Sequence, residues 1–529
     1  MKIINKMMSS SQAYRRLLAL VGLVALVAVV QPSIAAEAGE TVIEPATVIM
    51  VAPAQLRTRQ DMERAAAVRS PAPQAIEIPF RPTMSDSEYE EAKRAAAAAA
   101  IDSPKRPTVV APLGPLAPPT LIFQDIEGVD QITACGTCRP PDTHGAAGLT
   151  QFVEITNFNL DVFDKATGAS LMSIRLANFF GYFTQTIFDP RVVYDSTWNR
   201  WVISAEAFEE SPTVQLQFLA ISQTSDATGP YFIYAIDVNV NDNDDFWDYP
   251  QLGMDQDSII VTANVFGPVT FREARLFAVA KARLYNGLGF LVPLFTGLVG
   301  TPQPPIVLDQ NFRTFVVAAR PGPTTVTKYT LENSSRPNGT TLVASTITVP
   351  AFSIPPDAAQ PGTTDLLDTL DARFVNASTQ NGNSLWNVHT VNLSGFPAPK
   401  FYEFDTATNM VIQSGFFFAS LTSHDWNASI AANGNNDVYV TWSSTDPPAD
   451  INAQVRFSGR QAADPLGVID AGTALFTSPT FYNPSTDTVE RWGDYSAVTV
   501  DPVDGTGWIV NEKINDSTTW GSRIGQVGF

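Results

Sequence analysis

The sequence predicts an all-β protein, and three observations carry this prediction. After residue 118 the chain runs in short segments that alternate polar and apolar residues, such as Ala497–Val500, and this period of two is typical of half-buried strands. Turns rich in Gly, Pro, Asn and Asp separate the segments, and no long amphipathic helical pattern lies among them. The third observation is a repeat, in which a short strand, an Asp or Asn turn and a bulky apolar strand follow one another.

The repeat narrows the prediction to a seven-bladed β-propeller. Clear copies lie at residues 189–204, 249–262, 426–441 and 491–513, and weaker copies begin near Gly148, Ile306 and Asp371. These units, about seven in number, are spaced roughly 40–60 residues apart, as expected for propeller blades with some long loops. We expect residues 120–126 to pair with the C-terminal strand 523–529 and close the ring.

The propeller domain is predicted to span residues 118–529, and two segments of different composition precede it. Residues 1–36 match a signal peptide, because a basic start with Arg15 and Arg16 leads into a short apolar run that ends at small residues around Ala35. That run is shorter than the roughly 20 residues of a membrane span. Residues 37–117 are rich in Ala, Pro, Glu and Arg, which predicts a disordered linker with one helix near residues 86–101. A propeptide is the alternative.

The charge of the chain limits its partners. Its 529 residues carry a formal net charge of −20, and the isoelectric point is about 4.5. Such an acidic surface repels nucleic acid and anionic lipid, whereas it suits Ca²⁺, which takes oxygen ligands. No later stretch is apolar enough to cross a membrane. We expect a monomer that is secreted or held in the periplasm or at the cell surface.

Several motifs follow one another in a fixed order after residue 118. They are PPDTHGAAG at residues 140–148, DKATG at 164–168, DP at 189–190, YD at 194–195, RW at 200–201, AISQTSD at 220–226, DYP at 248–250 and WGDYS at 492–496. In this order they resemble a family of largely uncharacterised bacterial secreted β-propeller proteins, which are grouped loosely with the sialidase-like (BNR/Asp-box) propellers. The resemblance covers about residues 119–529. It implies a secreted propeller and transfers no catalytic residue.

The densest group of oxygen ligands predicts a calcium site. Asp237, Asn239 and Asn241 stand at positions one, three and five of a loop like that of an EF-hand, and Asp242 and Asp244 follow. Position six, which is glycine in an EF-hand, is Asp242 here, and no helices flank the loop, so a true EF-hand is not expected. A Ca²⁺-binding loop between strands and a merely solvated acidic loop both remain open.

The only two cysteines, Cys135 and Cys138, predict a local disulfide, since an exported C-x-x-C pair is normally oxidised. A redox role would need a thioredoxin-like pattern, which is absent. Zinc binding with His144 would lack a fourth ligand nearby.

Five residues are predicted to contact a ligand, namely Asp142, His144, Arg491, Trp492 and Asp494. His144 lies in a Gly/Pro/Asp turn, and the repeat does not require the Arg-Trp pair that leads into the last unit. The aspartates that recur before strands could hydrolyse a glycoside if two of them converged at about 5–10 Å. The interpretation that we favour is that they accept backbone N–H groups at turns. No G-x-S-x-G or H-E-x-x-H motif is present.

These observations predict a secreted β-propeller that binds a polysaccharide or protein ligand. The alternative is an extracellular carbohydrate-active hydrolase or lyase with its site on one face of the propeller. Two carboxylates, or a His–Tyr–Arg set, around a deep pocket on the ring axis would favour the enzyme.

Overall fold

The computed structural model describes residues 39–68, 76–102, 105–106, 118–207, 211–320 and 324–529. The predicted signal peptide at residues 1–36 therefore lies outside the described residues. Among the described residues, no helix is long and apolar enough to cross a membrane. The rest of the description concerns Gly39–Phe529 alone.

Antiparallel sheets of consecutive strands build this unit. The first two comprise β5 (His144–Ala147), β6 (Gln151–Thr156), β7 (Asn159–Asp164) and β8 (Ser170–Arg175), then β9 (Ile187–Asp195), β10 (Arg200–Ala207), β11 (Leu216–Ser222) and β12 (Tyr231–Asp237). The turn between β9 and β10 shows how the sequence sets a hairpin. Asp195 accepts the backbone N–H groups of Thr197 and Trp198, and Asn199 takes the left-handed conformation at φ +51°, which Asn tolerates better than most residues.

A ten-stranded sheet joins two of these units through a short strand. Its members are β13 (Phe246–Met254), β14 (Ser258–Phe266), β15 (Phe271–Ala280), β16 (Phe290–Leu298), β17 (Pro305–Val307), β22 (Ser378–Asn381), β23 (Ser384–Leu393), β24 (Phe396–Asp405) and β25 (Met410–Phe416), with β2 (Thr47–Val51) at its edge. The strand β17 pairs in parallel with β13 on one side and with β22 on the other. The inner strands of neighbouring units therefore run in the same direction.

The remaining units follow the same plan. They comprise β18 (Arg313–Ala318), β19 (Thr325–Glu332) and β20 (Thr341–Thr348), then β26 (His424–Ala432), β27 (Val438–Asp446), β28 (Ile451–Arg460) and β29 (Thr473–Thr477), and finally β31 (Ala497–Val500), β32 (Gly507–Asp516), β33 (Thr519–Gly528) and β4 (Thr120–Asp130). A two-stranded sheet adds β21 (Leu366–Leu367) and β30 (Val489–Glu490). Short helices cover connections, namely α4 (Gln131–Ala134), α5 (Leu176–Phe180), α6 (Lys281–Leu284) and the 3-10 helix η1 (Pro447–Ala449).

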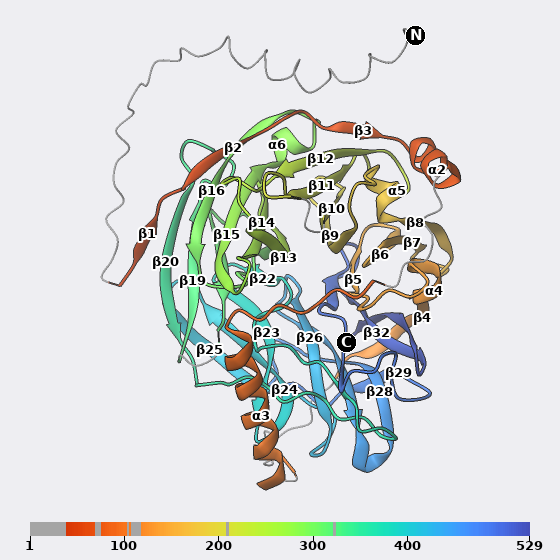
Figure 1. Ribbon diagram of the computed structural model, residues 1–529. Helices are drawn as coiled ribbons and strands as arrows, with labels where there is room; N and C mark the ends of the chain where they lie inside the picture. Colours follow the sequence, from red (N-terminus) through yellow and green to blue (C-terminus); the bar gives the residue numbers. More distant parts are fainter. Residues whose placement is uncertain (1–38, 69–75, 103–104, 107–117, 208–210, 321–323) are drawn as a thin grey trace, which may run out of the picture. The chain divides into compact units, whose positions relative to one another are not determined.

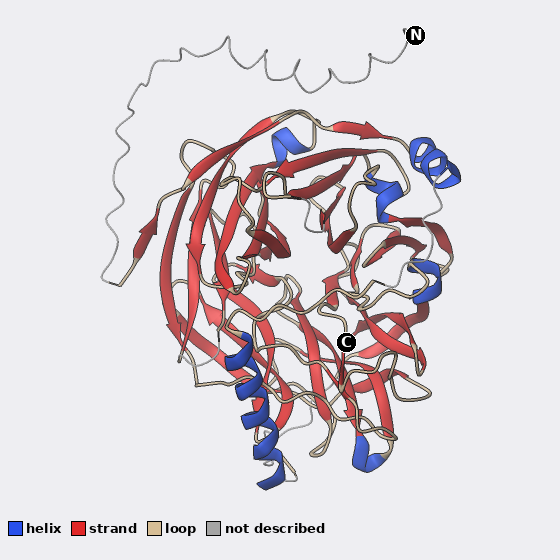
Figure 2. Cartoon of the chain, in the orientation of Figure 1, coloured by secondary structure: helices blue, strands red, loops and turns tan. Residues whose placement is uncertain are grey.

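The sheets stand around a common centre, as Figures 1 and 2 show. Their inner strands contact one another in a closed cycle, from β5 through β9, β13, β17, β22, β26 and β31 back to β5. The cycle closes where β33 pairs with β4, with Ile524 opposite Ile126, as the sequence predicted. A closed cycle of antiparallel sheets around one axis is the architecture of a β-propeller.

Most tryptophans lie in the core between the sheets. The side chains of Trp201, Trp247, Trp386, Trp442 and Trp508 are almost completely buried. Among the described tryptophans only Trp198 is exposed, at 56%. The radial arrangement needs bulky side chains to fill the widening space between neighbouring sheets, and Trp provides the largest apolar area.

The segment predicted to be a disordered linker is structured where it is described. Its strands β1 (Thr41–Ile43), β2 (Thr47–Val51) and β3 (Gln55–Arg57) pair with β20, β16 and β12 as additional outermost strands. Composition misled the prediction because the segment has no core of its own, and it completes the unpaired edges of other sheets instead. Figure 1 shows this red stretch along the outside of the ring.

Two helices belong to the same segment. The helix α2 (Arg59–Val68) buries Met62, and α3 (Asp86–Asp102) lies where the sequence predicted a helix near residues 86–101. The start of α3 has a capping box, in which the hydroxyl and backbone N–H of Ser85 both donate to the Glu88 carboxylate, at 2.7 and 3.1 Å.

The sulfur atoms of Cys135 and Cys138 lie at bonding distance in the turn after α4. The carbonyl of Cys138 accepts hydrogen bonds from Trp520 Nε1 at 2.7 Å and Gln131 Nε2 at 2.8 Å. The turn is thereby held against the sheet that closes the ring.

Candidate functional site

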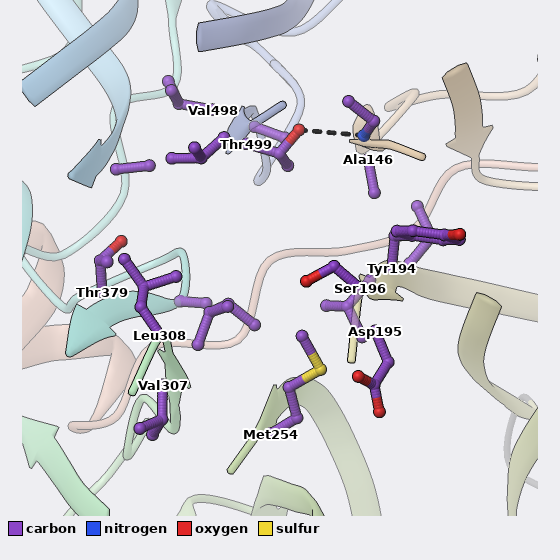
Figure 3. Close-up of a pocket in the computed structure, with 18 of the residues that line it drawn as sticks. Ala146, Tyr194, Asp195, Ser196, Met254, Val307, Leu308, Thr379, Val498 and Thr499 are labelled. Atoms are coloured by element: carbon purple, nitrogen blue, oxygen red, sulfur yellow. Dashed lines mark hydrogen bonds between the residues drawn. The ribbon is translucent and has the colours of Figure 1, made fainter. Parts of the chain in front are cut away.

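A pocket opens on the axis of the ring (Figure 3). Its volume is about 200 Å³, and its walls come from the inner strand of every sheet in the cycle. The residues labelled in Figure 3 are Ala146, Tyr194, Asp195, Ser196, Met254, Val307, Leu308, Thr379, Val498 and Thr499. Aliphatic side chains therefore dominate the walls, and small hydroxyl groups are interspersed among them.

The two carboxylates of the pocket and the Thr499 hydroxyl are already engaged in hydrogen bonds. The Asp195 carboxylate accepts from Lys281 Nζ at 2.7 Å and from Tyr285 OH at 2.6 Å. The Thr499 hydroxyl accepts the backbone N–H of Ala147 at 3.1 Å. The Asp255 carboxylate accepts from four groups, which are the hydroxyls of Thr314 and Ser334 and the N–H groups of Asp257 and Ser258. Neither carboxylate is left free to act as a general acid or base.

The predicted ligand residue His144 lines this pocket, but its ring is 7% exposed. Its Nδ1 accepts the backbone N–H of Val192 at 3.3 Å. Burial and the charge of Arg191 lower the pKa of His144 well below its usual value. The imidazole is therefore neutral and acts as a hydrogen-bond acceptor that joins β5 to β9.

The opposite end of the inner strands carries a cluster of buried charges. Asp189 lies near the start of β9 and Asp195 ends it, so about 20 Å of strand separates these two carboxylates. The same polarity holds for β13, where Asp248 lies near the start and Met254 at the end. The carboxylates buried at the charged end are Asp142, Asp189, Asp248, Asp494, Glu206 and Glu512.

Three of the predicted ligand residues meet in this cluster. Arg491 donates to Asp494 at 2.8 Å and to Asp368 at 2.7 Å, while the backbone N–H of Asp494 donates to Asp142 at 2.6 Å. Arg373 forms a two-pronged ion pair with Asp371, at 2.7 and 2.8 Å. The charges therefore form a connected internal network.

Several backbone positions in the cluster are strained. Asp142, Asp189 and Tyr249 have φ values of +48°, +49° and +61°, which L-residues adopt at a cost of order 1–3 kcal/mol each. Each is held by a neighbour: Asn157 Nδ2 donates to the Asp142 carboxylate, Asn157 Oδ1 accepts the N–H of Asp189, and Glu206 Oε1 accepts that of Tyr249. Accepting backbone N–H groups was the favoured interpretation of the aspartates that recur before strands, and Asp142 does so with the N–H of Asp494.

Burial dominates the ionisation of these carboxyl groups. It raises the pKa of Asp189 and of Glu206 well above their usual values, and neighbouring carboxylates raise both further. Burial also raises the pKa of Asp494 to about 8, although Arg491 opposes the shift. The cluster contains more carboxylates than cations to balance them.

Residues 76–84, here called the strap, cover the charged end. The Ile78 carbonyl accepts from Arg491 Nε at 3.1 Å, and the Arg81 carbonyl accepts from Arg373 Nη2 at 2.8 Å. The Phe80 ring lies against the same two guanidinium groups, 4.8 Å from that of Arg373 and 5.8 Å from that of Arg491. The strap crosses the ring centre before α3 begins (Figure 1).

The strap and the core cover four of the five predicted ligand residues. Asp142, Arg491 and Asp494 are brought together, but each is at most 8% exposed and lies in the covered network. Trp492 is 1% exposed, its ring packs 5.3 Å from that of Trp426, and its Nε1 donates to Ser443 at 3.2 Å. These residues hold the last sheet in place, which the repeat pattern alone could not reveal.

The loop that begins at Asp237 keeps its own geometry. Asp237 Oδ1 accepts the N–H groups of Gln215 and Asn239, and the buried Asn239 side chain exchanges hydrogen bonds with the Asn243 backbone. Asp237, Asn241, Asp242 and Asp244 are exposed. Calcium binding by this loop stays a prediction.

Sequence reasoning missed Glu206 and Glu512. One signal was present, since Glu206 and Glu512 each lie in a strand with a run of apolar residues, RWVISAEA and GWIVNEKI. A carboxylate inside a fully buried strand is rare unless it is paired or serves a site.

Comparisons with known proteins leave the function open. No family description and no curated protein matches the chain. Similar solved structures include the WD40 domain of SCAP from fission yeast, with 9% identity over 74% of this chain and 82% of that chain and a TM-score of 0.32. Trypanosoma rangeli sialidase in complex with sialic acid has 10% identity over 65% and 54% and a TM-score of 0.34. Parainfluenza virus 5 hemagglutinin-neuraminidase with ligand DANA has 10% identity over 66% and 95% and a TM-score of 0.35.

These likenesses carry no argument about activity at such identities and scores. The β-propeller fold rests on the strand order and the closed cycle of inner strands. The resemblance to bacterial secreted propellers stays a prediction.

Proposed function

We propose that the chain is a secreted, seven-bladed β-propeller that binds an extracellular ligand in its axial pocket. The count of seven is supported by the cycle of inner strands β5, β9, β13, β17, β22, β26 and β31, each of which begins or flanks one unit. Export rests on the predicted signal peptide.

The observation that carries the proposal is the character of the pocket. It is concave, open at the ends of the inner strands and walled by aliphatic side chains such as Met254, Val307 and Leu308, which suits the burial of one compact apolar group. No tryptophan lines it for stacking on a sugar. A side chain presented by an extracellular protein therefore fits it better than a polysaccharide does.

The chemistry of the pocket disfavours the alternative of a carbohydrate-active hydrolase or lyase. Two carboxylates of its lining, Asp195 and Asp255, are buried and saturated with hydrogen bonds, whereas glycoside hydrolysis needs two accessible carboxyl groups flanking the bond. The larger set of carboxylates lies at the other end beneath the strap.

A pair of matched substitutions tests the binding site. Leu308→Trp adds bulk at the pocket, where Leu308 is 36% exposed, and Leu56→Trp makes the same change at an exposed leucine on β3. The chain is screened against a library of displayed peptides and against a glycan array. We expect peptide ligands whose binding Leu308→Trp abolishes and Leu56→Trp preserves.

The same material is screened for polysaccharide degradation. Release of products by the wild-type chain would overturn the proposal in favour of the enzyme. If the chain binds only glycans and Leu308→Trp abolishes that binding, the ligand of the pocket is a polysaccharide and not a protein.

A further inference from the structure

Three carboxylates from two neighbouring sheets converge at the charged end of the ring. Asp189 comes from β9, Glu206 from β10 and Asp248 from β13, and one oxygen atom of each lies within 4.8 Å of the others. All three side chains are buried, with exposures of 2%, 0% and 5%. Like charges at this spacing repel strongly where water is excluded.

One oxygen of this group has no partner. Glu206 Oε1 accepts the N–H of Tyr249, but Glu206 Oε2 is buried and accepts no hydrogen bond in the described structure. A buried acceptor without a donor is costly, and such groups normally bind protein, water or an ion. The unpartnered oxygen belongs to the same carboxylate that faces Asp189 and Asp248.

The surrounding arginines do not neutralise the three charges. Arg373 is held by both oxygens of Asp371. Arg191 donates to Asn376 and to the Val375 carbonyl, and its guanidinium stacks on the Tyr495 ring.

Among the described cations, Arg81 alone forms an ion pair with the group, and it reaches Asp248 at 3.5 Å. Three carboxylates therefore share one long ion pair.

We propose that Asp189, Glu206 and Asp248 bind a single Ca²⁺ ion that cross-links the two sheets at the start of their inner strands. Ca²⁺ accepts carboxylate oxygens at 2.3–2.6 Å, so two of its ligands can lie up to about 5 Å apart, as these do. An all-oxygen set without His or Cys favours such a hard cation over zinc. The Tyr495 hydroxyl, which donates to Asp189 at 2.7 Å, orients that carboxylate from the opposite side.

This site differs from the exposed loop at Asp237–Asp244, and the strap shields it from solvent. The ion is therefore expected to enter during folding and to exchange slowly.

The metal content of the full chain tests the proposal. The protein is purified without chelator, desalted into metal-free buffer and examined by elemental analysis. A second portion is unfolded in denaturant with EDTA and refolded with Ca²⁺, with Mg²⁺ or with neither. We expect one Ca²⁺ per chain in the native sample and in the Ca²⁺-refolded sample, and a higher Tm with Ca²⁺ than without metal.

Substitutions locate the ion. Glu206→Gln keeps the shape of the side chain and is expected to abolish retention of Ca²⁺. Glu512→Gln alters an equally buried carboxylate outside the group, and Asp242→Asn alters the exposed loop; both are expected to retain the ion.

Retention by Glu206→Gln, or loss of the ion in Asp242→Asn alone, would overturn the proposal. A native chain free of calcium would do the same, and a higher Tm of Glu206→Gln in that case would show that the three carboxyl groups share protons instead. Because native metal content needs no refolding, the test stands even if the EDTA-treated chain aggregates.

Discussion

The two ends of the inner strands differ in chemistry although the same strands build both. At their starts, carboxylates and guanidinium groups form a buried network beneath the strap, and at their ends, aliphatic side chains surround an open pocket. The charged end holds neighbouring sheets together through specific pairs, which fail when one partner is removed. The apolar end has fewer such pairs. With the proposed ligand site in the pocket, the contrast divides the ring into a structural end and a proposed recognition end.

The largest expected effect comes from breaking a pair at the charged end. Arg373→Met leaves the buried Asp371 carboxylate without its two-pronged partner, and it should lower the free energy of unfolding by about 3–5 kcal/mol. Denaturant unfolding followed by tryptophan fluorescence measures the loss.

The control is Arg313→Met, which removes an ion pair with Glu332 in which the Arg313 side chain is 61% exposed. It should cost about 0–1 kcal/mol. Equal losses for the two variants would show that the internal network contributes no more than a surface pair.

The second effect concerns the strap. Ile78 belongs to the strap and is 4% exposed, and Ile78→Ala should cost about 2–4 kcal/mol through lost burial and the cavity left behind. Limited proteolysis should then cut near residues 76–84 before the ring is degraded, whereas Val269→Ala, at an 84% exposed position, should leave the pattern unchanged. A strap that stays protected in Ile78→Ala would mean that the arginine contacts alone hold it.

A third effect is a pH dependence of stability that arises at Glu154, where β4 and β33 close the ring. Glu154 accepts the N–H of Val129 and the hydroxyl of Ser522, and burial, reinforced by Asp161, raises its pKa from 4.5 to about 8. The folded chain therefore binds this proton more tightly than the unfolded chain does. The stabilisation that comes from this proton is fully present below pH 4.5 and is lost as pH rises towards about 8. Over this range the free energy of unfolding falls by up to about 1.4 kcal/mol per pH unit.

Glu154→Gln should remove this slope, so the variant gains stability relative to wild type as pH rises from 5 to 8. Glu63→Gln, at a 62% exposed side chain, should leave the slope unchanged. Thermal melting at a series of pH values compares the three proteins, and parallel curves for Glu154→Gln and wild type would contradict the assignment.

The smallest effect is expected at the pocket. Thr499→Val removes the hydroxyl that accepts the N–H of Ala147 at 3.1 Å, and it should cost about 0.5–1.5 kcal/mol. The exposed Thr348→Val serves as control in the same urea titration. A cost as large as that of Arg373→Met would abolish the proposed division between a structural end and a recognition end.

The sequence predicted the ring better than the site. Periodicity and the Asp-Gly turn at residues 504–505 identify strands, and Gly505 indeed takes a φ of +76° between β31 and β32. Both signals are local, and local patterns can be recognised in a single sequence. The predicted pairing of residues 120–126 with the last strand is also confirmed.

The site depends on contacts that no local pattern contains. Arg491 and Asp494 were identified as polar residues near a strand start, but their burial follows from the strap, more than 400 residues earlier in the chain. The strap in turn is held by contacts with arginines that lie elsewhere in the sequence. Composition therefore predicted a disordered linker in the segment that contains the strap, which covers the charged end of the ring.

The pairing of β33 with β4 also determines when folding of the ring can be completed. The two strands are joined by contacts between residues almost 400 positions apart, such as Arg523 and Glu127. Contacts so distant in the chain form slowly, because a long loop must close before they bring any gain. Until residues 519–528 arrive, β32 and β4 expose unpaired edges, which are templates for association with other chains. Ring closure is thus a late step, and the chain needs protection from aggregation until it is complete.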